Sequence, residues 1–285
     1  MRLVTWNTQW CKGLDGVVSP KRIVQGARSL GDFDVLCLQE IAANYPALTD
    51  DSAPEQPAEI ARLLPGFEIV FGPAIDEQPL GQSQRQRFGN LIASRLPILQ
   101  VQHIALPSPM LDSDPHLWMP RQCTVCTVAA PWGPVRVMTT HLEYHSLAHR
   151  HAQAQALRAW HAQACDQARA PIAADQPDLG TPYQPKPLTT DAIICGDFNF
   201  IAHSEPYFEM TNRTKPHPLA DAWLERHPGQ PHPPTFRLFD DTYGPDAVAC
   251  DFCFVSESLA KRLTAIKVDT STQVSDHQPV YIEMA

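Results

Sequence analysis

Several side chains suited to catalysis stand beside short apolar runs of this sequence. They are Asn7 after LVTW, Glu40 after VLCLQ, His141 after VMTT, Asp197 and Asn199 after IICG, Asp251 before FCFV, and Asp276 with His277 just before PVYIE. Such runs are typical of buried strands, and strand ends collect at the rim of a sheet, where the scaffold meets its loops. We therefore expect these side chains to share one pocket.

The pattern suits metal-assisted phosphoryl chemistry. Mg²⁺ loses its water reluctantly and is usually held by one or two carboxylates together with waters and phosphate oxygens of the substrate. Glu40, Asn7 and Asp276 offer oxygen atoms of that type. Hydrolysis of a phosphate ester also needs an oriented water, a proton acceptor and hydrogen-bond donors aimed at the developing charge. Side chains of these kinds are Asp197, Asn199, His277 and His141.

The same segments, taken in order, resemble a known family. TWN, LQE, GDFN, CDFCFVS and SDHQPV together are similar to motifs of the endonuclease/exonuclease/phosphatase superfamily, and the similarity extends from residue 4 to residue 280. One such motif alone is weak, but five in the family's order are specific. The resemblance implies an α/β fold, a four-layered sandwich of two facing mixed β-sheets flanked by helices. It also implies Mg²⁺-dependent cleavage of phosphate esters by in-line attack of water, with Mn²⁺ as a substitute ion.

The resemblance also implies roles for individual residues. Glu40 would be the principal metal ligand, helped by Asn7 and Asp276. Asp197 would orient or deprotonate the attacking water, and Asn199 would hold Asp197 and the phosphate. Asp251 would orient His277, which would touch the phosphate. The general base is therefore either Asp197 or the Asp251–His277 pair. A carboxylate at the start of the apolar run FCFV is costly to bury alone, so Asp251 needs a partner, and His277 is the partner that we predict.

Two details refine the resemblance. His141, in TTHLEYHS, places the chain with phosphatases, sphingomyelinases, deadenylases and tyrosyl-DNA phosphodiesterases, because abasic-site endonucleases have Tyr at that strand end. An imidazole there, cationic or neutral, can donate to a phosphoryl oxygen. Many relatives also have Arg two residues before the strand aspartate, where this chain has Ala249 followed by Cys250. The positive charge could come instead from the arginines that flank FGNLIAS, which are Arg85, Arg87 and Arg95.

Length and patterning set the scaffold that must position these groups. The chain has 285 residues, 44% of them hydrophobic, and we expect a single domain over residues 1–285. Many short strand-like runs alternate with a helix that starts at Ser19 and ends at Gly31, and with a long helix over residues 146–168. This mixture indicates an α/β or α+β sandwich with the helices outside the sheets.

Composition narrows the function classes. The net charge of −9 excludes a broad basic surface for gripping a long phosphate backbone. Eight cysteines lie mostly in apolar runs, which indicates a reducing compartment. No stretch is apolar for long enough to be a secretion signal or membrane span, so we expect a cytoplasmic protein. No pattern indicates an obligate protein partner.

Metal sites of other kinds fit poorly. His141 and His145 lack zincin spacing and begin on a predicted strand, so no helix face would gather both imidazoles. The pairs Cys123 with Cys126 and Cys250 with Cys253 also fall in predicted strands, where positions i and i+3 point to opposite faces. The remaining histidines of the long helix, which are His149, His151 and His161, are expected on its solvated face.

The leading hypothesis is a Mg²⁺-dependent phosphodiesterase or phosphomonoesterase that acts on a nucleic acid end or a small phosphorylated molecule. The alternative is a DNA endonuclease or exonuclease of the abasic-site repair type. A catalytically inactive binding protein on the same scaffold is disfavoured because all four carboxylates are present. Residues 41–58, 106–121 and 205–246 are expected to form the pocket walls. Within them Trp118 or Phe236 either stacks a base or packs a loop.

Overall fold

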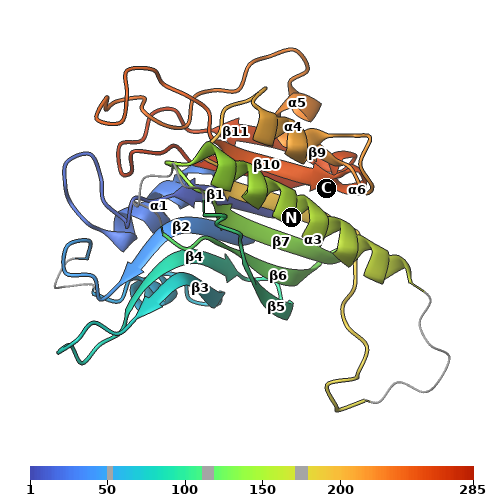
Figure 1. Cartoon of the computed structure of the whole chain (residues 1–285), viewed down its shortest axis with the longest axis horizontal. Helices are drawn as coiled ribbons and strands as arrows, with labels where there is room; N and C mark the ends of the chain where they lie inside the picture. Colours follow the sequence, from blue (N-terminus) through green and yellow to red (C-terminus); the bar gives the residue numbers. More distant parts are fainter. Residues whose placement is uncertain (50–53, 111–118, 171–178) are drawn as a thin grey trace.

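The chain folds into two six-stranded mixed sheets that face each other with helices on their outer sides, as a computed structural model shows (Figure 1). The structure describes residues 1–49, 54–110, 119–170 and 179–285. The predicted four-layered α/β sandwich is confirmed. Within these ranges no helix combines the length and the apolar character needed to cross a membrane.

The first sheet is formed largely by the N-terminal part of the chain. Its strand order is β11-β12-β1-β2-β4-β3, with β1 parallel to β2 and the other neighbours antiparallel. The bounds of its strands are β1 Arg2–Asn7, β2 Val35–Ala43, β3 Glu68–Glu77, β4 Gln86–Ser94, β11 Leu263–Val268 and β12 Val280–Met284.

The second sheet has the order β5-β6-β7-β8-β10-β9, with β7 parallel to β8 and the other neighbours antiparallel. Its strands are β5 Ile98–Ala105, β6 Gln122–Ala130, β7 Gly133–His141, β8 Ala192–Asp197, β9 Leu219–Asp221 and β10 Asp251–Ser256. The helices are α1 Pro20–Leu30, α2 Gln56–Leu63, α3 Leu147–Arg169, α4 Glu205–Thr211, α5 Ala222–Arg226 and α6 Glu257–Ala260.

Three apolar clusters hold the layers together. Between the sheets, residues such as Leu3 and Val35 of the first sheet share a buried cluster with Val137 and Ile193 of the second. Outside the first sheet, α1 and α2 bury a second cluster, and outside the second sheet, α3 and α4 bury a third. Each sheet is therefore covered on both faces, which explains why its strands read as nearly continuous apolar runs.

The helix ends follow the sequence signals. Ser19 caps α1, with its Oγ accepting from the backbone N–H of Arg22, and Pro20 follows as the first helical residue. Ser146 caps α3 in the same way. The prediction that the histidines of α3 lie on its solvated face is wrong for His149 and His161, which are both buried.

Candidate active site

The predicted side chains surround one cavity of about 160 Å³ at the rim of the sandwich. Glu40, His141, Asp197, Asn199, Asp276 and His277 all line it. Asn7 and Asp251 lie directly behind this lining, where Asn7 contacts Asp197 and Asp251 contacts His277. The structure thus brings together every one of the eight predicted site residues, although they span some 270 positions of sequence.

Strand register fixes the second-sheet half of the site. His141 is the partner of Asp197 in the parallel pairing of β7 with β8, and Asp251 is the partner of Asp197 in the antiparallel pairing of β8 with β10. Three of the predicted site residues therefore lie in a row across three neighbouring strands. Gly196 is required just before Asp197, because its φ is +135° and a Cβ there would overlap the carbonyl oxygen of Thr140.

Asp197 is the centre of the hydrogen-bond network. Its Oδ2 accepts from Asn7 Nδ2 at 2.9 Å, and its Oδ1 accepts from the backbone N–H of Asn199 at 2.9 Å in an Asx-turn. The imidazole Nε2 atoms of His141 and His277 lie 3.5 and 3.7 Å from Oδ2. Burial alone would raise the pKa of Asp197, but the positive charge of His277 and these donors outweigh it and lower the pKa. Asp197 is therefore an ionised acceptor.

Glu40 is presented by an irregular part of β2. The register of β2 with β4 shifts between Leu38 and Ile41, and Glu40 has a φ of +58°. Its Oε1 accepts from Asn7 Nδ2 at 3.1 Å. Burial, followed by the nearby negative charge of Asp276, raises the pKa of Glu40 to about 7. The carboxylate therefore lies where negative charge is poorly compensated.

Asp276 contributes a second carboxyl group on the same side of the cavity. Ser275 Oγ donates to the backbone carbonyl of Asn7 at 2.8 Å and lies 3.3 Å from Asp276 Oδ1, so the segment is tied to the end of β1. Burial raises the pKa of Asp276 as well. Glu40 and Asp276 thus form a concentration of negative charge that a cation would stabilise.

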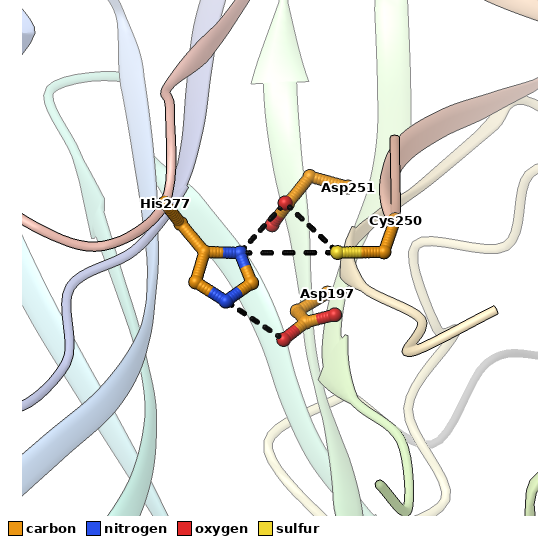
Figure 2. A group of neighbouring side chains, drawn as sticks. All are labelled: Asp197, Cys250, Asp251 and His277. Carbon is orange, nitrogen blue, oxygen red and sulfur yellow. Dashed lines mark hydrogen bonds and ion pairs between the residues drawn. The ribbon is translucent and has the colours of Figure 1, made fainter. Parts of the chain in front are cut away.

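His277 and Asp251 form the pair that the sequence predicts. Nδ1 of His277 lies 2.8 Å from Oδ2 of Asp251, and the two side chains point toward each other in Figure 2. Burial would lower the pKa of His277, but Asp251 and Asp197 outweigh it and hold that pKa well above its ordinary value. The ring of Phe236 stacks on the His277 ring, with centroids 4.4 Å apart and planes at 20°. His277 is therefore a rigidly held cation.

His141 has the opposite electrostatic state. Burial, with a further contribution from the positive charge of Arg121, lowers the pKa of His141 to about 3. Its Nε2 lies 3.7 Å from Glu40 Oε1 and 3.5 Å from Asp197 Oδ2. Of the two states that the sequence left open, the neutral imidazole is the one the structure favours at physiological pH.

Asn199 links the loop after β8 to the end of β7. Its Nδ2 donates to the backbone carbonyl of Leu142 at 2.9 Å, and its backbone has a φ of +51°. Because Leu142 directly follows His141, this bond holds the His141 and Asp197 segments together. Asn199 also lines the cavity, so its remaining amide oxygen belongs to the site.

Arg121 is a site residue that sequence reasoning missed. It immediately precedes β6, lines the cavity, and is only 6% exposed. Its Nε donates to Glu143 Oε2 at 3.3 Å, whereas its buried Nη1 has no hydrogen-bond partner within the described ranges. A buried arginine with a donor left over in a cavity is suited to bind an anion. In the sequence, Arg121 could have been identified as a candidate because it directly precedes the predicted strand QCTVCTV.

The arginines that flank FGNLIAS do not supply this charge. Arg85 pairs with Asp76 and Arg87 pairs with Glu55, while Arg95 pairs with both Asp32 and Asp34. None of the three lines the cavity. Arg121, and not one of these three arginines, is therefore the arginine that lines the cavity. Of the two aromatic residues that the sequence left open, Phe236 packs on His277 and Trp118 lies outside the described residues.

Two groups of side chains could hold a metal ion. Candidate ligand atoms of Asp197, Cys250, Asp251 and His277 all lie within 4.8 Å of one another (Figure 2). In that group, however, Nδ1 of His277 is already engaged by Oδ2 of Asp251 at 2.8 Å. The other group is Glu40, Asp276 and Asn7, whose oxygen donors suit Mg²⁺. Both carboxyl groups are buried with a raised pKa, so a cation beside them would favour their ionised forms.

The model of the "Endonuclease/Exonuclease/phosphatase family" matches residues 4–277. No curated protein sequence gives a significant match.

Three solved structures illustrate the similarity of fold. A mannosyl-6-phosphatase of Bacteroides thetaiotaomicron has a TM-score of 0.68 at 16% identity, over 100% of this chain and 99% of that one. A 3′ phosphatase from Neisseria, bound to a product DNA hairpin, has a TM-score of 0.61 at 20% identity, over 100% and 99%. A humanized TDP2 of D. rerio has a TM-score of 0.60 at 16% identity, over 99% and 97%.

Proposed function

Because the chain belongs to the endonuclease/exonuclease/phosphatase family, we propose that it is a metal-dependent phosphoric ester hydrolase. The observation that carries this proposal is the contact network of Asp197. One ionised carboxylate is held by Asn7 and Asn199 within 3.7 Å of two imidazoles that differ in protonation. A neutral donor, a cationic donor and a proton acceptor at one cavity meet the needs of phosphoryl transfer to water.

We propose that Glu40, Asn7 and Asp276 hold the metal ion, with Mg²⁺ as the natural ion and Mn²⁺ as a substitute. A divalent cation bound there would neutralise negative charge on phosphoryl oxygens and so lower the barrier to nucleophilic attack. The remaining side chains of the cavity orient the ester and the water and move the proton.

Asp197 is the proposed general base. A base must be ionised and must keep a lone pair for the proton of the water. The lowered pKa of Asp197 meets the first need, and each of its oxygens accepts one hydrogen bond from the described residues and so keeps a second lone pair. Asn7 and the backbone N–H of Asn199 fix the two carboxylate oxygens, which sets the direction of attack. His277 cannot be the base while Asp251 keeps it protonated. This assignment chooses between the two alternatives that the sequence left open.

His277, His141 and Arg121 are the proposed donors to the phosphoryl group. His277 lines the cavity as an imidazolium whose Nε2 is not engaged by Asp251, and Arg121 lines it with a buried Nη1 that has no hydrogen-bond partner among the described residues. The water oxygen bonds to phosphorus as the bond to the leaving oxygen breaks. Asp197 takes the proton of the water and later releases it to solvent, while the departing oxygen, on the opposite side of the phosphorus, takes a proton from solvent. His277, whose Nε2 lies 3.7 Å from Asp197 Oδ2, is on the side of the attacking water and donates a hydrogen bond to a non-bridging phosphoryl oxygen.

A nuclease that grips a long duplex is less well supported. The net charge is −9, and the arginines nearest the rim of the first sheet are paired with carboxylates. A substrate that presents one phosphate at an end, or as a small molecule, suits the cavity better. The eight cysteines are buried and unpaired, which supports a reducing compartment such as the cytoplasm.

The proposal is tested with a panel of phosphate esters and two matched variants. Wild type, Asp197→Asn and the control Asp166→Asn, an exposed position on α3 outside the cavity, are assayed with Mg²⁺ and with chelator, for phosphate release from the monoesters and for cleavage products of the diesters. The panel holds abasic duplex DNA, phosphotyrosyl-ended DNA, oligo(A), sphingomyelin, inositol phosphates and nucleotides. We expect Mg²⁺-dependent turnover that Asp197→Asn abolishes and Asp166→Asn retains. Absence of turnover on the whole panel would refute the proposal.

A further inference from the structure

We propose that the outer wall of this cavity, formed mainly by Trp10, Met119, Tyr144 and Tyr243, binds a planar aromatic group carried by the phosphate ester. The enzyme would then select substrates that have a nucleobase or an aryl substituent beside a single phosphate. This inference rests on the proposed hydrolase function and names its substrate class. It comes from side chains that the proposed chemistry leaves without a role.

A line of aromatic rings leads from the mouth of the cavity to the catalytic imidazole. Tyr144 and Tyr243 both line the cavity and are 38% and 46% exposed. Their ring centroids are 6.3 Å apart at 77°, and the Tyr243 ring lies 6.0 Å from the ring of Phe236. Phe236 in turn stacks on His277. Exposed aromatic rings grouped at a cavity are typical of binding surfaces.

The opposite sheet contributes Trp10 to the same cavity. Trp10 follows β1, and the three consecutive residues Gln9, Trp10 and Cys11 have φ values of 46°, 45° and 61°. Such conformations are costly for residues other than glycine, and strain of this kind is found mostly at functional sites. The backbone is held there by Gln56, whose Nε2 donates to the Trp10 carbonyl at 2.7 Å. The fold therefore maintains an unfavourable backbone that brings an indole to the cavity.

Charge at the cavity limits the substrate to one phosphate. Arg121 is the sole lysine or arginine among the described residues that line it. A polyphosphate, or an inositol carrying several phosphates, would place further negative charge close to Asp276 and Glu40 without a matching cation. A sugar ring would need many hydrogen-bond partners, whereas the outer wall is formed mainly by Trp10, Met119, Tyr144 and Tyr243. An aromatic ring makes its best contacts with such a wall.

The first experiment compares esters that differ only in the aromatic character of the substituent. Benzyl phosphate and cyclohexylmethyl phosphate have similar size and both release a primary alcohol. We expect wild type with Mg²⁺ to show a KM about three- to tenfold lower for benzyl phosphate. A parallel pair, adenosine 5′-monophosphate and ribose 5-phosphate, tests a nucleobase as the source of the ring. Preference in either pair supports the inference and identifies the source, and equal KM values in both pairs overturn it.

The second experiment assigns the preference to the proposed wall. In Tyr144→Leu and Tyr243→Leu the KM of the preferred aromatic ester should rise toward that of its non-aromatic partner, with little change in kcat. The control Tyr183→Leu, at a tyrosine that is exposed and outside the cavity, should keep the preference. A preference that survives in the double leucine variant would overturn the assignment.

Failure of this inference can be told apart from failure of the proposed function. Turnover of all four esters without preference removes the aromatic subsite and leaves the hydrolase intact. Absence of turnover both of these four monoesters and of the whole panel above, which includes diesters, removes the proposed function. Calorimetric binding of benzylphosphonate against cyclohexylmethylphosphonate, neither of which has a cleavable ester bond, then decides the aromatic preference without catalysis.

Discussion

The carboxyl group of Glu40 provides a sharp test of the electrostatics of the site, because the protein without metal should be more stable when that group is removed. Burial and Asp276 raise the pKa of Glu40 from 4.5 to about 7. The folded state therefore holds the proton of Glu40 more tightly than the unfolded state does. The stability that this protonated carboxyl group contributes to the folded state is present in full below about pH 4.5 and is lost as the pH rises to about 7.

The expected size follows from this shift. At about 1.4 kcal/mol for each pKa unit, an ionised Glu40 lowers the free energy of unfolding by about 3 kcal/mol at pH 8. The side chain is 17% exposed, so solvent screens this cost only partly. Glu40→Gln keeps the shape and can still accept from Asn7, but it carries no charge. We expect the variant to melt about 6 °C higher than wild type at pH 8 with chelator present.

The assay is thermal unfolding of wild type and Glu40→Gln at pH 5 and pH 8, with chelator and then with Mg²⁺. At pH 5 the difference should fall below about 1 kcal/mol, because Glu40 is then mostly protonated in the folded state. Mg²⁺ should stabilise wild type alone, by about 2.7 kcal/mol at a hundred times its Kd. Glu257→Gln, at an exposed position, controls for loss of any surface charge. A Glu40→Gln variant that melts at or below wild type at pH 8 without metal would refute this reasoning.

Three further substitutions test other parts of the account. Asp251→Asn should lower the pKa of His277, observed by NMR, and reduce kcat by about 10²- to 10⁴-fold; an unchanged imidazole pKa would show that Asp251 does not keep His277 protonated. Arg121→Lys should raise KM for phosphate esters about tenfold or more, because lysine cannot pair with Glu143 and also donate to the phosphate; unchanged KM would remove Arg121 from the site. Gly196→Ala should destabilise the protein by at least about 3 kcal/mol in denaturant unfolding, through strain and overlap with Thr140. Gly229→Ala, at a positive φ in open space, should cost at most about 2 kcal/mol; equal costs would contradict the overlap.

The sequence allowed the location of the site to be predicted because strand ends are visible in it. Apolar runs that stop at a polar residue identify where a strand reaches the rim, and the buried carboxylate of Asp251 required a partner, which is His277. The pairing register that aligns His141, Asp197 and Asp251 could not be predicted from the runs themselves. That register depends on which strands become neighbours in the sheet.

Burial of polar residues was the least predictable feature. Arg121 is buried by Glu143, which lies 22 residues further along the chain, so no local pattern distinguishes it from the exposed Arg85. In α3, Ala and Gln are spread around the helix and leave no clear apolar stripe. Two of its histidines are buried by other segments, as His161 contacts Arg136 and His149 contacts the carbonyl of Pro109. Only tertiary contacts decide such positions.

The position of the bound cation tests the account most directly. Crystals soaked with Mn²⁺, which gives a strong anomalous signal, would locate the ion by X-ray diffraction. We predict one anomalous peak within coordination distance of a Glu40 carboxylate oxygen and beside Asn7. A peak bound instead between Cys250, Asp251 and His277, or no peak in the cavity at saturating Mn²⁺, would contradict it.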